Sequence, residues 1–320
     1  MTLPSEFALI ARHFRPLAGP GAVGLSDDAA LLDLPPGRQL VLAADAMVAG
    51  VHFLAGDPPG AIGRKLLRVN LSDLAAMGAA PLGYLMTCGF AQGTDDEWIA
   101  AFAAGLAEDQ KEFGITLLGG DTVVTPGPAS FSLTILGTVA PGRALMRVGA
   151  RPGDDLWVSG TIGDGALGLL ALTGRLPADA HLADRYRLPR PRLALGQALA
   201  GIAHAAMDVS DGLAQDLGHL ARAAGCAAEI RADAVPLSDA ARKALAADPS
   251  LLARIMGGGD DYELLFAADP ADASRVSAAA EAARTPVMRI GRFLAGEGVS
   301  VLDAAGRPLS LPSAGWSHFG

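Results

Sequence analysis

The residues of this chain whose types and spacing could do chemistry are mostly aspartates. They stand at expected turns or at the ends of expected elements, and small residues flank them. A turn or a helix cap explains any one of them, but their recurrence favours a shared site. Carboxylates that share a site repel one another unless a cation compensates their charge, and Mg²⁺ is the cation that oxygen ligands prefer. The set is Asp27, Asp28, Asp45, Asp73, Asp121, Asp208, Asp211, Asp260 and Asp261.

A shared magnesium site of this kind indicates nucleotide-dependent phosphoryl transfer. Mg²⁺ usually keeps several waters and is bound jointly by carboxylates and substrate phosphates. Small residues beside the acids would let backbone N–H groups approach those phosphates. A glycine-rich loop at 160–168 resembles a phosphate-binding loop, but it lacks the Gly-Lys-Ser/Thr ending of a Walker A motif and is weak support on its own.

The elements that must position the aspartates follow from apolar periodicity. We expect strands at 39–45, 82–90, 114–121 and 130–139, and helices at 61–77 and 95–113. The segment 68–81 alone favours a second interpretation, in which Asp73 caps a helix that starts at Leu74. A turn-rich segment at 147–155 marks a boundary. Beyond it we expect a strand at 156–160, a helix that ends near Ala224, and a glycine turn at 257–259 that leads into a strand.

Length and composition exclude several classes of protein. At 320 residues the chain has material for one large or two medium domains. Its apolar runs stay below the roughly 18 residues of a membrane span, and its first residues lack the features of a signal peptide. A net charge of −9 argues against a general nucleic-acid binder. Cys88 and Cys226 form no metal-type cluster. Together these features predict a cytoplasmic protein that acts without nucleic acid or membrane.

Five ordered motifs give the chain a family resemblance that covers nearly its whole length. Asp45 precedes Val-Ala-Gly-Val-His-Phe (48–53), and Val-Asn-Leu-Ser-Asp-Leu-Ala-Ala-Met-Gly-Ala (69–79) follows. Gly-Gly-Asp-Thr (119–122), Asp-Val-Ser-Asp-Gly-Leu (208–213) and Gly-Gly-Asp-Asp-Tyr-Glu-Leu (258–264) complete the set. In these motifs the chain resembles the thiamine-monophosphate kinases, which belong to the ATP-binding superfamily of aminoimidazole ribonucleotide synthetase.

The resemblance implies an architecture and a reaction. The fold would be α/β (α+β) with two domains, in which the N-terminal sheet forms a barrel across a homodimer. Residues 1–147 would bind ATP and Mg²⁺ and form the dimer, and residues 148–320 would close over nucleotide and substrate. The reaction would be the Mg²⁺-assisted, in-line transfer of the γ-phosphoryl group of ATP to thiamine monophosphate, the last step of thiamine diphosphate biosynthesis.

The resemblance also implies roles for single residues. Several Mg²⁺ ions would be held by Asp28, Asp45, Asp73, Asp121, Asp208 and Asp211. Nucleotide contacts would come from Gly120, Asp121, Arg147 and Ser210, and contacts to thiamine monophosphate from His52, Asp260 and Trp316. Asp73, Asp121, Asp208 and Arg147 would act in catalysis.

This chain departs from the family pattern at three places. Ala43 and Ala44 precede Asp45 where the family often has Ser or Thr, and Asp260 stands where Glu is usual. Residues 24–28 read Gly-Leu-Ser-Asp-Asp instead of Gly-Ile-Gly-Asp-Asp, so either acid of that pair could be the metal ligand.

Other readings of the chain stay open at this point. Selenophosphate synthetases and hydrogenase-maturation proteins fit poorly, since the expected N-terminal and C-terminal cysteines are missing. The purine-pathway synthetase remains possible on fold, as does a regulatory protein that binds Mg²⁺ or nucleotide without turnover. For His52, packing beside Phe53 is the alternative to substrate binding.

Overall fold

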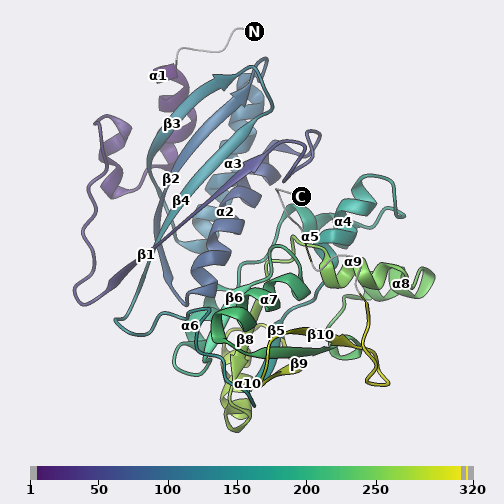
Figure 1. Cartoon of the computed structure of the whole chain (residues 1–320). Coiled ribbons are helices and arrows are strands. Elements are labelled where there is room, and N and C mark those ends of the chain that lie inside the picture. Colours follow the sequence, from purple (N-terminus) through teal and green to yellow (C-terminus); the bar gives the residue numbers. More distant parts are fainter. Residues whose placement is uncertain (1–5, 311–314, 316–320) are drawn as a thin grey trace. The chain divides into compact units, whose positions relative to one another are not determined.

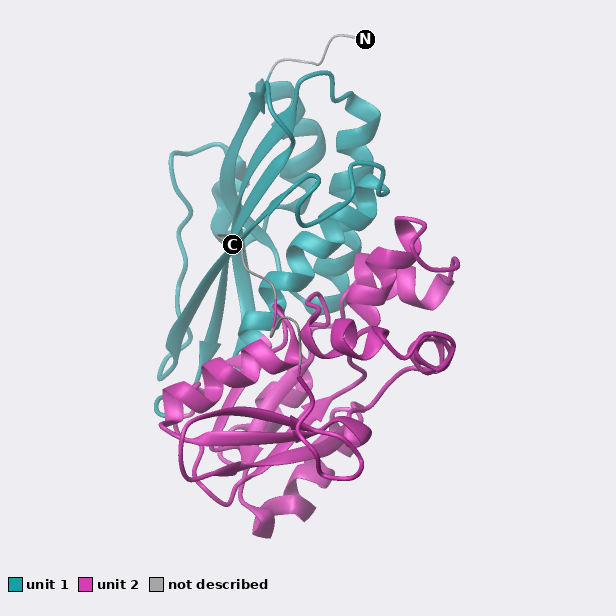
Figure 2. Cartoon of the chain, turned by 45° about the vertical axis from the view of Figure 1, so that its right-hand side comes forward, with its two compact units in different colours: residues 1–74, 79–142 teal, residues 75–78, 143–320 magenta. Residues whose placement is uncertain are grey.

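The computed structural model describes residues 6–310 and residue 315 (Figure 1). The chain divides into two compact units, shown in different colours in Figure 2. Unit 1 comprises residues 1–74 and 79–142, and unit 2 comprises residues 75–78 and 143–320. None of the helices within the described residues combines the length and apolarity that a membrane span requires.

Unit 1 is a four-stranded sheet with two long helices on one of its faces (Figures 1 and 2). The strand order is β1-β4-β2-β3, in which β2 and β3 run parallel and the other neighbours run antiparallel. Short helices precede the sheet in the chain. In sequence order the elements are α1 (Glu6–Leu9), η1 (Ile10–Phe14), η2 (Arg15–Leu17), η3 (Pro20–Leu25), β1 (Gln39–Val48), α2 (Pro59–Ala76), β2 (Ala80–Ala91), α3 (Asp96–Phe113), β3 (Leu117–Thr125) and β4 (Ser130–Val139).

Helix α2 forms because its apolar residues recur on almost every side and nearly all of them are buried. Leu66, Leu67, Leu71 and Leu74 have no exposed surface. The helix runs through Asp73 without interruption, so the interpretation of Asp73 as a cap before Leu74 is wrong. The apolar neighbours on both sides of Asp73 carry the helix across it, because their burial outweighs the low helix propensity of one aspartate.

The sheet of unit 1 alternates between a covered and an open face. In β2, Tyr84, Met86 and Cys88 are buried, while Leu85 between them is 41% exposed. In β1, Leu42 is 59% exposed beside buried Val41. Successive side chains of a strand point to opposite faces, so the helices cover one face and the other carries exposed apolar residues. Within the described residues the sheet is open, since β1 and β3 form its two edges.

Unit 2 is a six-stranded sheet in the order β10-β7-β9-β5-β8-β6, with β10 and β7 parallel and the other neighbours antiparallel. Its sheet does not close on itself within the described residues either. Its elements are β5 (Asp155–Ser159), α4 (Asp164–Leu172), α5 (Ala180–Arg187), α6 (Leu193–Leu199), β6 (Ala205–Asp208), α7 (Leu213–Ala224), β7 (Ala227–Arg231), η4 (Ala232–Ala234), α8 (Asp239–Ala247), α9 (Leu251–Gly257), β8 (Leu264–Ala268), η5 (Pro270–Asp272), α10 (Ala273–Ala282), β9 (Val287–Leu294) and β10 (Gly298–Leu302).

Strand β8 is buried on both faces, which explains why its sequence is a continuous apolar run. Leu265 packs in a core with residues of α7 and α9. Phe266 packs in a second core with residues of α6 and α10. The mixed α/β fold with two domains that the sequence predicts is therefore confirmed.

Candidate active site

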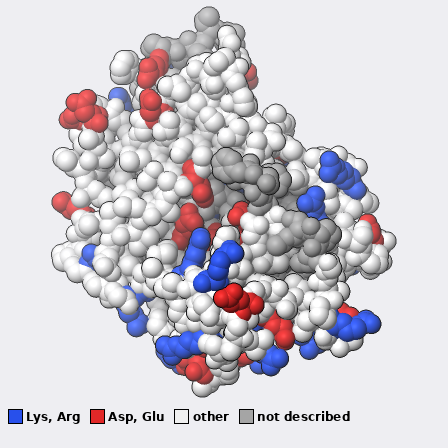
Figure 3. Space-filling view, in the orientation of Figure 1, with Lys and Arg blue, Asp and Glu red and all other residues white. Residues whose placement is uncertain are grey.

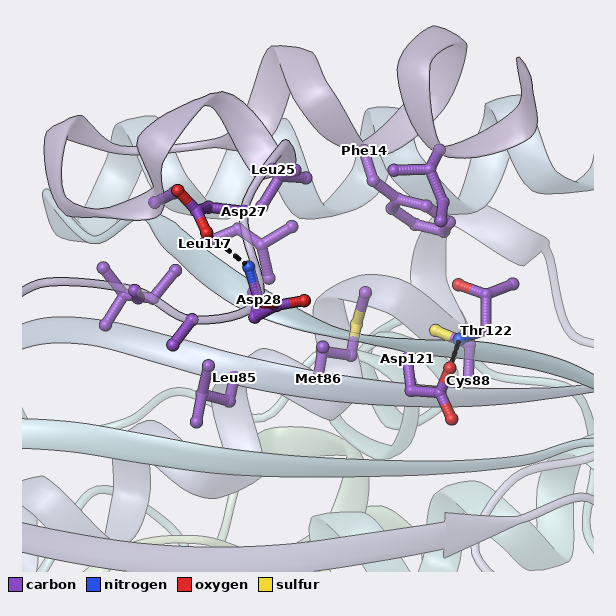
Figure 4. Close-up of a pocket in the computed structure, with 17 residues that line it drawn as sticks. Phe14, Leu25, Asp27, Asp28, Leu85, Met86, Cys88, Leu117, Asp121 and Thr122 are labelled. Carbon is purple, nitrogen blue, oxygen red and sulfur yellow. Dashed lines mark hydrogen bonds between the residues drawn. The ribbon is translucent and has the colours of Figure 1, made fainter. Parts of the chain in front are cut away.

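Unit 1 carries a pocket between the N-terminal short helices and the strands β2 and β3 (Figure 4). Asp27, Asp28 and Asp121 lie around it together with Gly120. Both Asp27 and Asp28 are exposed, and Oδ1 of Asp27 accepts a hydrogen bond from the backbone N–H of Asp28 at 2.9 Å. The apolar part of the pocket is lined by Ile10, Phe14, Leu25, Leu85, Met86, Leu117 and Leu118.

Gly120 is a position that only glycine can fill. Its φ is +155°, and a Cβ at this position would overlap the backbone carbonyl of Met86 on the neighbouring strand. The parallel register that pairs Gly120 with Met86 also pairs Asp121 with Thr87. Because strand β3 passes so close to β2, exposed Asp121 is held at the pocket by backbone packing.

The negative charge of Asp121 affects the pKa of Cys88, a buried residue of strand β2. Cys88 is buried and lines the same pocket. Burial raises the pKa of the Cys88 thiol, and the charge of Asp121 raises this pKa further. Cys88 is therefore a protonated, unreactive thiol, in agreement with a carboxylate of Asp121 that lies close by.

Asn70 links helix α2, which carries Asp73, to strand β1 at Asp45. The backbone N–H of Asp45 on β1 donates to Oδ1 of Asn70 at 3.0 Å, and Nδ2 of Asn70 donates to the carbonyl of Leu66 at 2.9 Å. Asn70 is completely buried. Residues i and i+3 share a helix face, so Asp73 lies on the same side of α2 as Asn70, the residue that contacts β1. Sequence reasoning missed this role of Asn70, whose signal is an amide between Val69 and Leu71 in a segment rich in apolar residues.

The turn after β1 fixes the ring of His52. Nδ1 of His52 accepts a hydrogen bond from the backbone N–H of Val48 at 3.0 Å. Nδ1 therefore carries no proton, and the neutral ring holds its proton on Nε2. The carbonyl of His52 accepts a hydrogen bond from Nζ of buried Lys65 at 3.0 Å. His52 is half-buried and can offer a donor at Nε2, which suits an anionic ligand.

In unit 2, the predicted site residues Ser210 and Asp260 lie on two segments that are hydrogen-bonded to each other. The N–H of Asp260 donates to the carbonyl of Ser210 at 2.9 Å, and the N–H of Tyr262 donates to the carbonyl of Val209 at 2.8 Å. The end of β6 is paired with the start of β8 next to them, at Asp208 and Leu264. The backbone thus brings Asp208, Ser210 and Asp260 together.

Asp216 adds a carboxylate to this part of unit 2, and sequence reasoning missed it. It is almost fully buried, and its Oδ2 accepts from the N–H groups of Asp211 and Gly212 at 3.0 and 3.1 Å. Burial and, to a lesser extent, the charges of Asp208 and Asp211 together raise the pKa of Asp216 to about 7. The available signal is its spacing from Leu213 and Leu220, which puts an acid on the apolar face of α7.

The donor set at Asp211 and Asp216 fits a divalent cation. Ligand atoms of Asp211, Asp216 and His219 lie within 4.8 Å of one another. A hard cation such as Mg²⁺ prefers carboxylate oxygens, and it would remove the mutual repulsion that raises the pKa of Asp216. Nε2 of Gln215 donates to Oδ2 of Asp211 at 3.3 Å, and Gly315 packs against Gln215.

Two predicted site residues, Arg147 and Trp316, are not placed beside the other site residues by any contact given above. Arg147 is exposed in the segment before β5. Trp316 lies outside the described residues, so its role stays a prediction. On the face drawn in Figure 3, acidic and basic side chains are interspersed among a larger number of other residues.

Two N–H groups of the glycine-rich loop at 160–168 are bonded to a side chain of the chain itself. The N–H groups of Gly163 and Gly165 donate to the carboxylate of Asp261, at 2.8 and 3.1 Å. In a phosphate-binding loop, such N–H groups bind a phosphate. Here the carboxylate of Asp261 accepts these two bonds in place of a phosphate.

Comparisons with known families match both units. Residues 26–139 match the family described as AIR synthase related protein, N-terminal domain. Residues 151–304 match the family described as AIR synthase related protein, C-terminal domain.

Individual relatives extend the match over almost the whole chain. The thiamine-monophosphate kinase of Caulobacter vibrioides is 48% identical over 321 residues, which cover 98% of this chain and 91% of that protein. The crystal structure of the thiamine-monophosphate kinase of Stenotrophomonas maltophilia is 42% identical, with a TM-score of 0.85 over 97% of this chain and 99% of that one. The structure of AaThiL complexed with AMPPCP and TMP is 30% identical, with a TM-score of 0.78 over 98% and 97% of the two chains.

Proposed function

Since the chain belongs to the thiamine-monophosphate kinases, within the AIR synthase related family, we propose that it transfers the γ-phosphoryl group of ATP to thiamine monophosphate and releases thiamine diphosphate and ADP. The observation that carries this proposal is the placement of carboxylates at the pocket of unit 1 and around Asp216 of unit 2. AaThiL, which shares the fold over nearly its whole length, is complexed with AMPPCP and TMP.

The carboxylates divide between the two units in this proposal. The N-terminal part, residues 1–147, would supply the ATP and Mg²⁺ site, and residues 148–320 would close over nucleotide and substrate. Mg²⁺ supplies charge neutralisation for the phosphates when it is bound. Nucleotide contacts come from Gly120, Asp121, Arg147 and Ser210. The acids that would hold Mg²⁺ are Asp28, Asp45, Asp73, Asp121, Asp208 and Asp211.

Transfer to a phosphate monoester requires no general base. The acceptor has a second pKa of about 6 and is mostly a dianion at neutral pH. An oxygen of this dianion attacks the γ-phosphorus, the bond from that phosphorus to the bridging oxygen breaks, and ADP leaves. What the protein must supply is charge neutralisation and alignment of the two phosphates. Asp73, Asp121, Asp208 and Arg147 would contribute to both.

His52 fits the acceptor side of this reaction. Its Nδ1 is occupied by the N–H of Val48, so its Nε2–H can donate to an oxygen of the acceptor phosphate but cannot take a proton from it. Asp260 and Trp316 would complete the contacts to thiamine monophosphate. A carboxylate suits the cationic thiazolium ring, and an aromatic side chain suits ring stacking.

The exposed apolar face of unit 1 supports a homodimer. Leu40, Leu42 and Leu85 lie on the sheet face opposite α2 and α3, and Leu42 and Leu85 are 59% and 41% exposed. Contiguous apolar surface of this kind is typical of an interface between protein chains. The proposed occupant is a second copy of the same sheet, so that the two open sheets together form a barrel.

A ³¹P NMR time course with ATP, Mg²⁺ and thiamine monophosphate tests the proposed activity, with a control that lacks the acceptor. The expected result is a new diphosphate signal pair that appears together with ADP only when the acceptor is present. ADP and inorganic phosphate in both samples would contradict the proposal, and would direct attention to the purine-pathway members of the family.

A further inference from the structure

The side chain of Asp261 makes its hydrogen bonds inside unit 2, at the start of helix α4. It has no exposed surface. Its Oδ2 accepts from the N–H of Gly163 and its Oδ1 from the N–H of Gly165, at 2.8 and 3.1 Å. Complete burial raises the pKa of Asp261, and the two N–H donors offset part of this effect. The carboxylate thus forms a fixed link between the segment 258–263 and α4.

The two residues that flank Asp261 have an unusual backbone. Asp260 and Tyr262 have φ values of +69° and +51°, in the left-handed region that residues other than glycine rarely adopt. Such conformations persist where surrounding contacts over-determine them, and they cluster at binding and catalytic sites. Here the segment is held by the side-chain hydrogen bonds of Asp261 and by two backbone bonds, from the N–H of Asp260 to Ser210 and from the N–H of Tyr262 to Val209. In addition, Nη2 of Arg185 donates to the carbonyl of Asp261 at 3.1 Å.

Helix α4 also packs directly on Asp260. A Cβ at Gly165 would overlap the carbonyl of Asp260 and would lie 2.8 Å from its Cβ. Residue 165 donates its backbone N–H to Asp261, and the close approach of the two backbones requires it to be glycine. This contact constrains the backbone and Cβ of Asp260.

We propose that Asp261 is a positioning residue for the substrate, which acts by holding Asp260 in the backbone conformation that directs its carboxylate into the site. This inference rests on the proposed function, in which Asp260 contacts thiamine monophosphate. It assigns separate roles to two adjacent acids of one motif. Asp260 meets the ligand, and Asp261 ties the segment to α4.

A double-mutant cycle tests whether Asp261 acts through Asp260. Asparagine at 261 keeps one acceptor oxygen but turns its NH₂ toward one of the two N–H donors, so one bond is lost. We expect Asp261→Asn to raise KM for thiamine monophosphate about tenfold, the effect of one displaced polar contact, while KM for ATP changes less than about twofold. In the Asp260→Ala background, Asp261→Asn should produce no further rise, because the residue through which it acts is gone.

Asp154→Asn is the matched control for the loss of a buried carboxylate. Asp154 is also buried in unit 2, and its Oδ2 accepts from the N–H of Arg151 at 2.9 Å. Asp154 comes directly before β5, whose first residue pairs with Ala268 at the end of β8. The site residue Asp208 pairs with Leu264, at the opposite end of β8. Asp154→Asn should lower the melting temperature without changing either KM.

A second pair of variants keeps the inference testable if Asp261→Asn does not fold. Gly165→Ala leaves the carboxylate in place and pushes against Asp260. Gly168→Ala, in the same helix, meets the carbonyl of Leu182 just as closely but does not touch Asp260. We expect Gly165→Ala to raise KM for thiamine monophosphate and Gly168→Ala to leave it unchanged.

The outcomes separate this inference from the proposed function. A wild-type protein that does not phosphorylate thiamine monophosphate would overturn the proposed function itself. An active wild type whose KM for thiamine monophosphate is unchanged by Asp261→Asn or by Gly165→Ala would overturn the positioning role alone. So would additive effects in the cycle, because they would show that Asp261 does not act through Asp260.

Discussion

At the scale of single residues, the chemistry that a side chain can perform depends on which of its atoms already forms a hydrogen bond within the protein. His52 illustrates this, because its Nδ1 accepts from the N–H of Val48 while Nε2 keeps the proton. A general base needs a free lone pair within reach of the proton that it takes. The hydrogen bond to Val48 removes that lone pair, so His52 is suited to binding an anion and not to proton transfer.

The first prediction concerns His52→Gln. Glutamine retains an N–H donor but lacks the ring that the turn orients, so binding of the acceptor phosphate should weaken. We expect KM for thiamine monophosphate to rise by about tenfold with a much smaller change in kcat, since the interaction is present in both ground and transition states. Steady-state kinetics at saturating ATP measure both constants. A steep fall in kcat at unchanged KM would contradict the binding role.

The second prediction concerns Asp216 and pH. The pKa of this carboxyl is 3.8 in an unfolded chain and about 7 in the folded protein. Between these values the folded state holds a proton that the unfolded state has lost, so the free energy of unfolding should fall as pH rises from about 4 to about 7. The contribution is at most about 4 kcal/mol, from ~1.4 kcal/mol per pKa unit.

Thermal unfolding in EDTA across this pH range measures the effect. Asp216→Asn should flatten the slope, because asparagine resembles the protonated acid and does not titrate. Asp239→Asn, at a side chain that is 96% exposed, serves as the control and should leave the slope as it is in the wild type. Equal slopes in wild type and Asp216→Asn would argue against the raised pKa.

At the scale of elements, the aspartates of unit 1 depend on how helix α2 meets strand β1. Asp45 lies within β1, paired with Leu133 of β4, and the contact through Asn70 ties its backbone to helix α2. The side chain of Asn70 accepts a hydrogen bond from the N–H of Asp45 and donates one to the carbonyl of Leu66. A buried amide of this kind stabilises the packing only while both partners are present.

The third prediction is that Asn70→Ala disturbs metal binding through Asp45. The change leaves the N–H of Asp45 without Asn70 as its acceptor and should cost about 1–3 kcal/mol of stability. The Mg²⁺ concentration for half-maximal activity should rise several-fold, while KM for thiamine monophosphate stays nearly constant. A Mg²⁺ titration of initial rates measures this. Asp109→Asn, which breaks a buried ion pair of α3 with Arg68, is the control for lost stability alone.

At the scale of the whole molecule, the open face of the sheet of unit 1 carries apolar residues that are exposed in the single chain. Its apolar residues alternate with the buried ones that pack on α2 and α3. An exposed apolar sheet that does not close within the described residues also invites aggregation. A second copy that joins its sheet to this one in a barrel would cover that surface and pair the edge strands.

The fourth prediction is that Leu42→Asp converts a dimer into monomers. A charge in the centre of an apolar interface is costly to desolvate, whereas the same change at an exposed residue elsewhere is not. Met288→Asp, at a β9 side chain that is 47% exposed, is the matched control and should leave the dimer intact. Analytical ultracentrifugation distinguishes the two states. A wild-type protein that sediments as a monomer would contradict the proposed dimer.

Much of this protein is determined by the sequence alone. Apolar periodicity predicts helix 61–77, which the structure places at Pro59–Ala76, and strand 130–139, which it places at Ser130–Val139. The recurrence of aspartates beside small residues and the five ordered motifs lead to the correct family. These features are local, because helix and strand periods and turn residues depend on neighbours a few positions away.

The tertiary structure alone decided which partner each polar group meets. Gly163 and Asp261 are separated by 98 positions, and no local pattern shows that the glycine loop is filled by that carboxylate. Asn70 and Asp45 are separated by 25 positions, and Asn70 reads equally well as part of a turn. The pKa of Asp216 is raised by burial and by two aspartates that only the fold brings near it. Burial and charge act through space, so their effects appear only when the chain has packed.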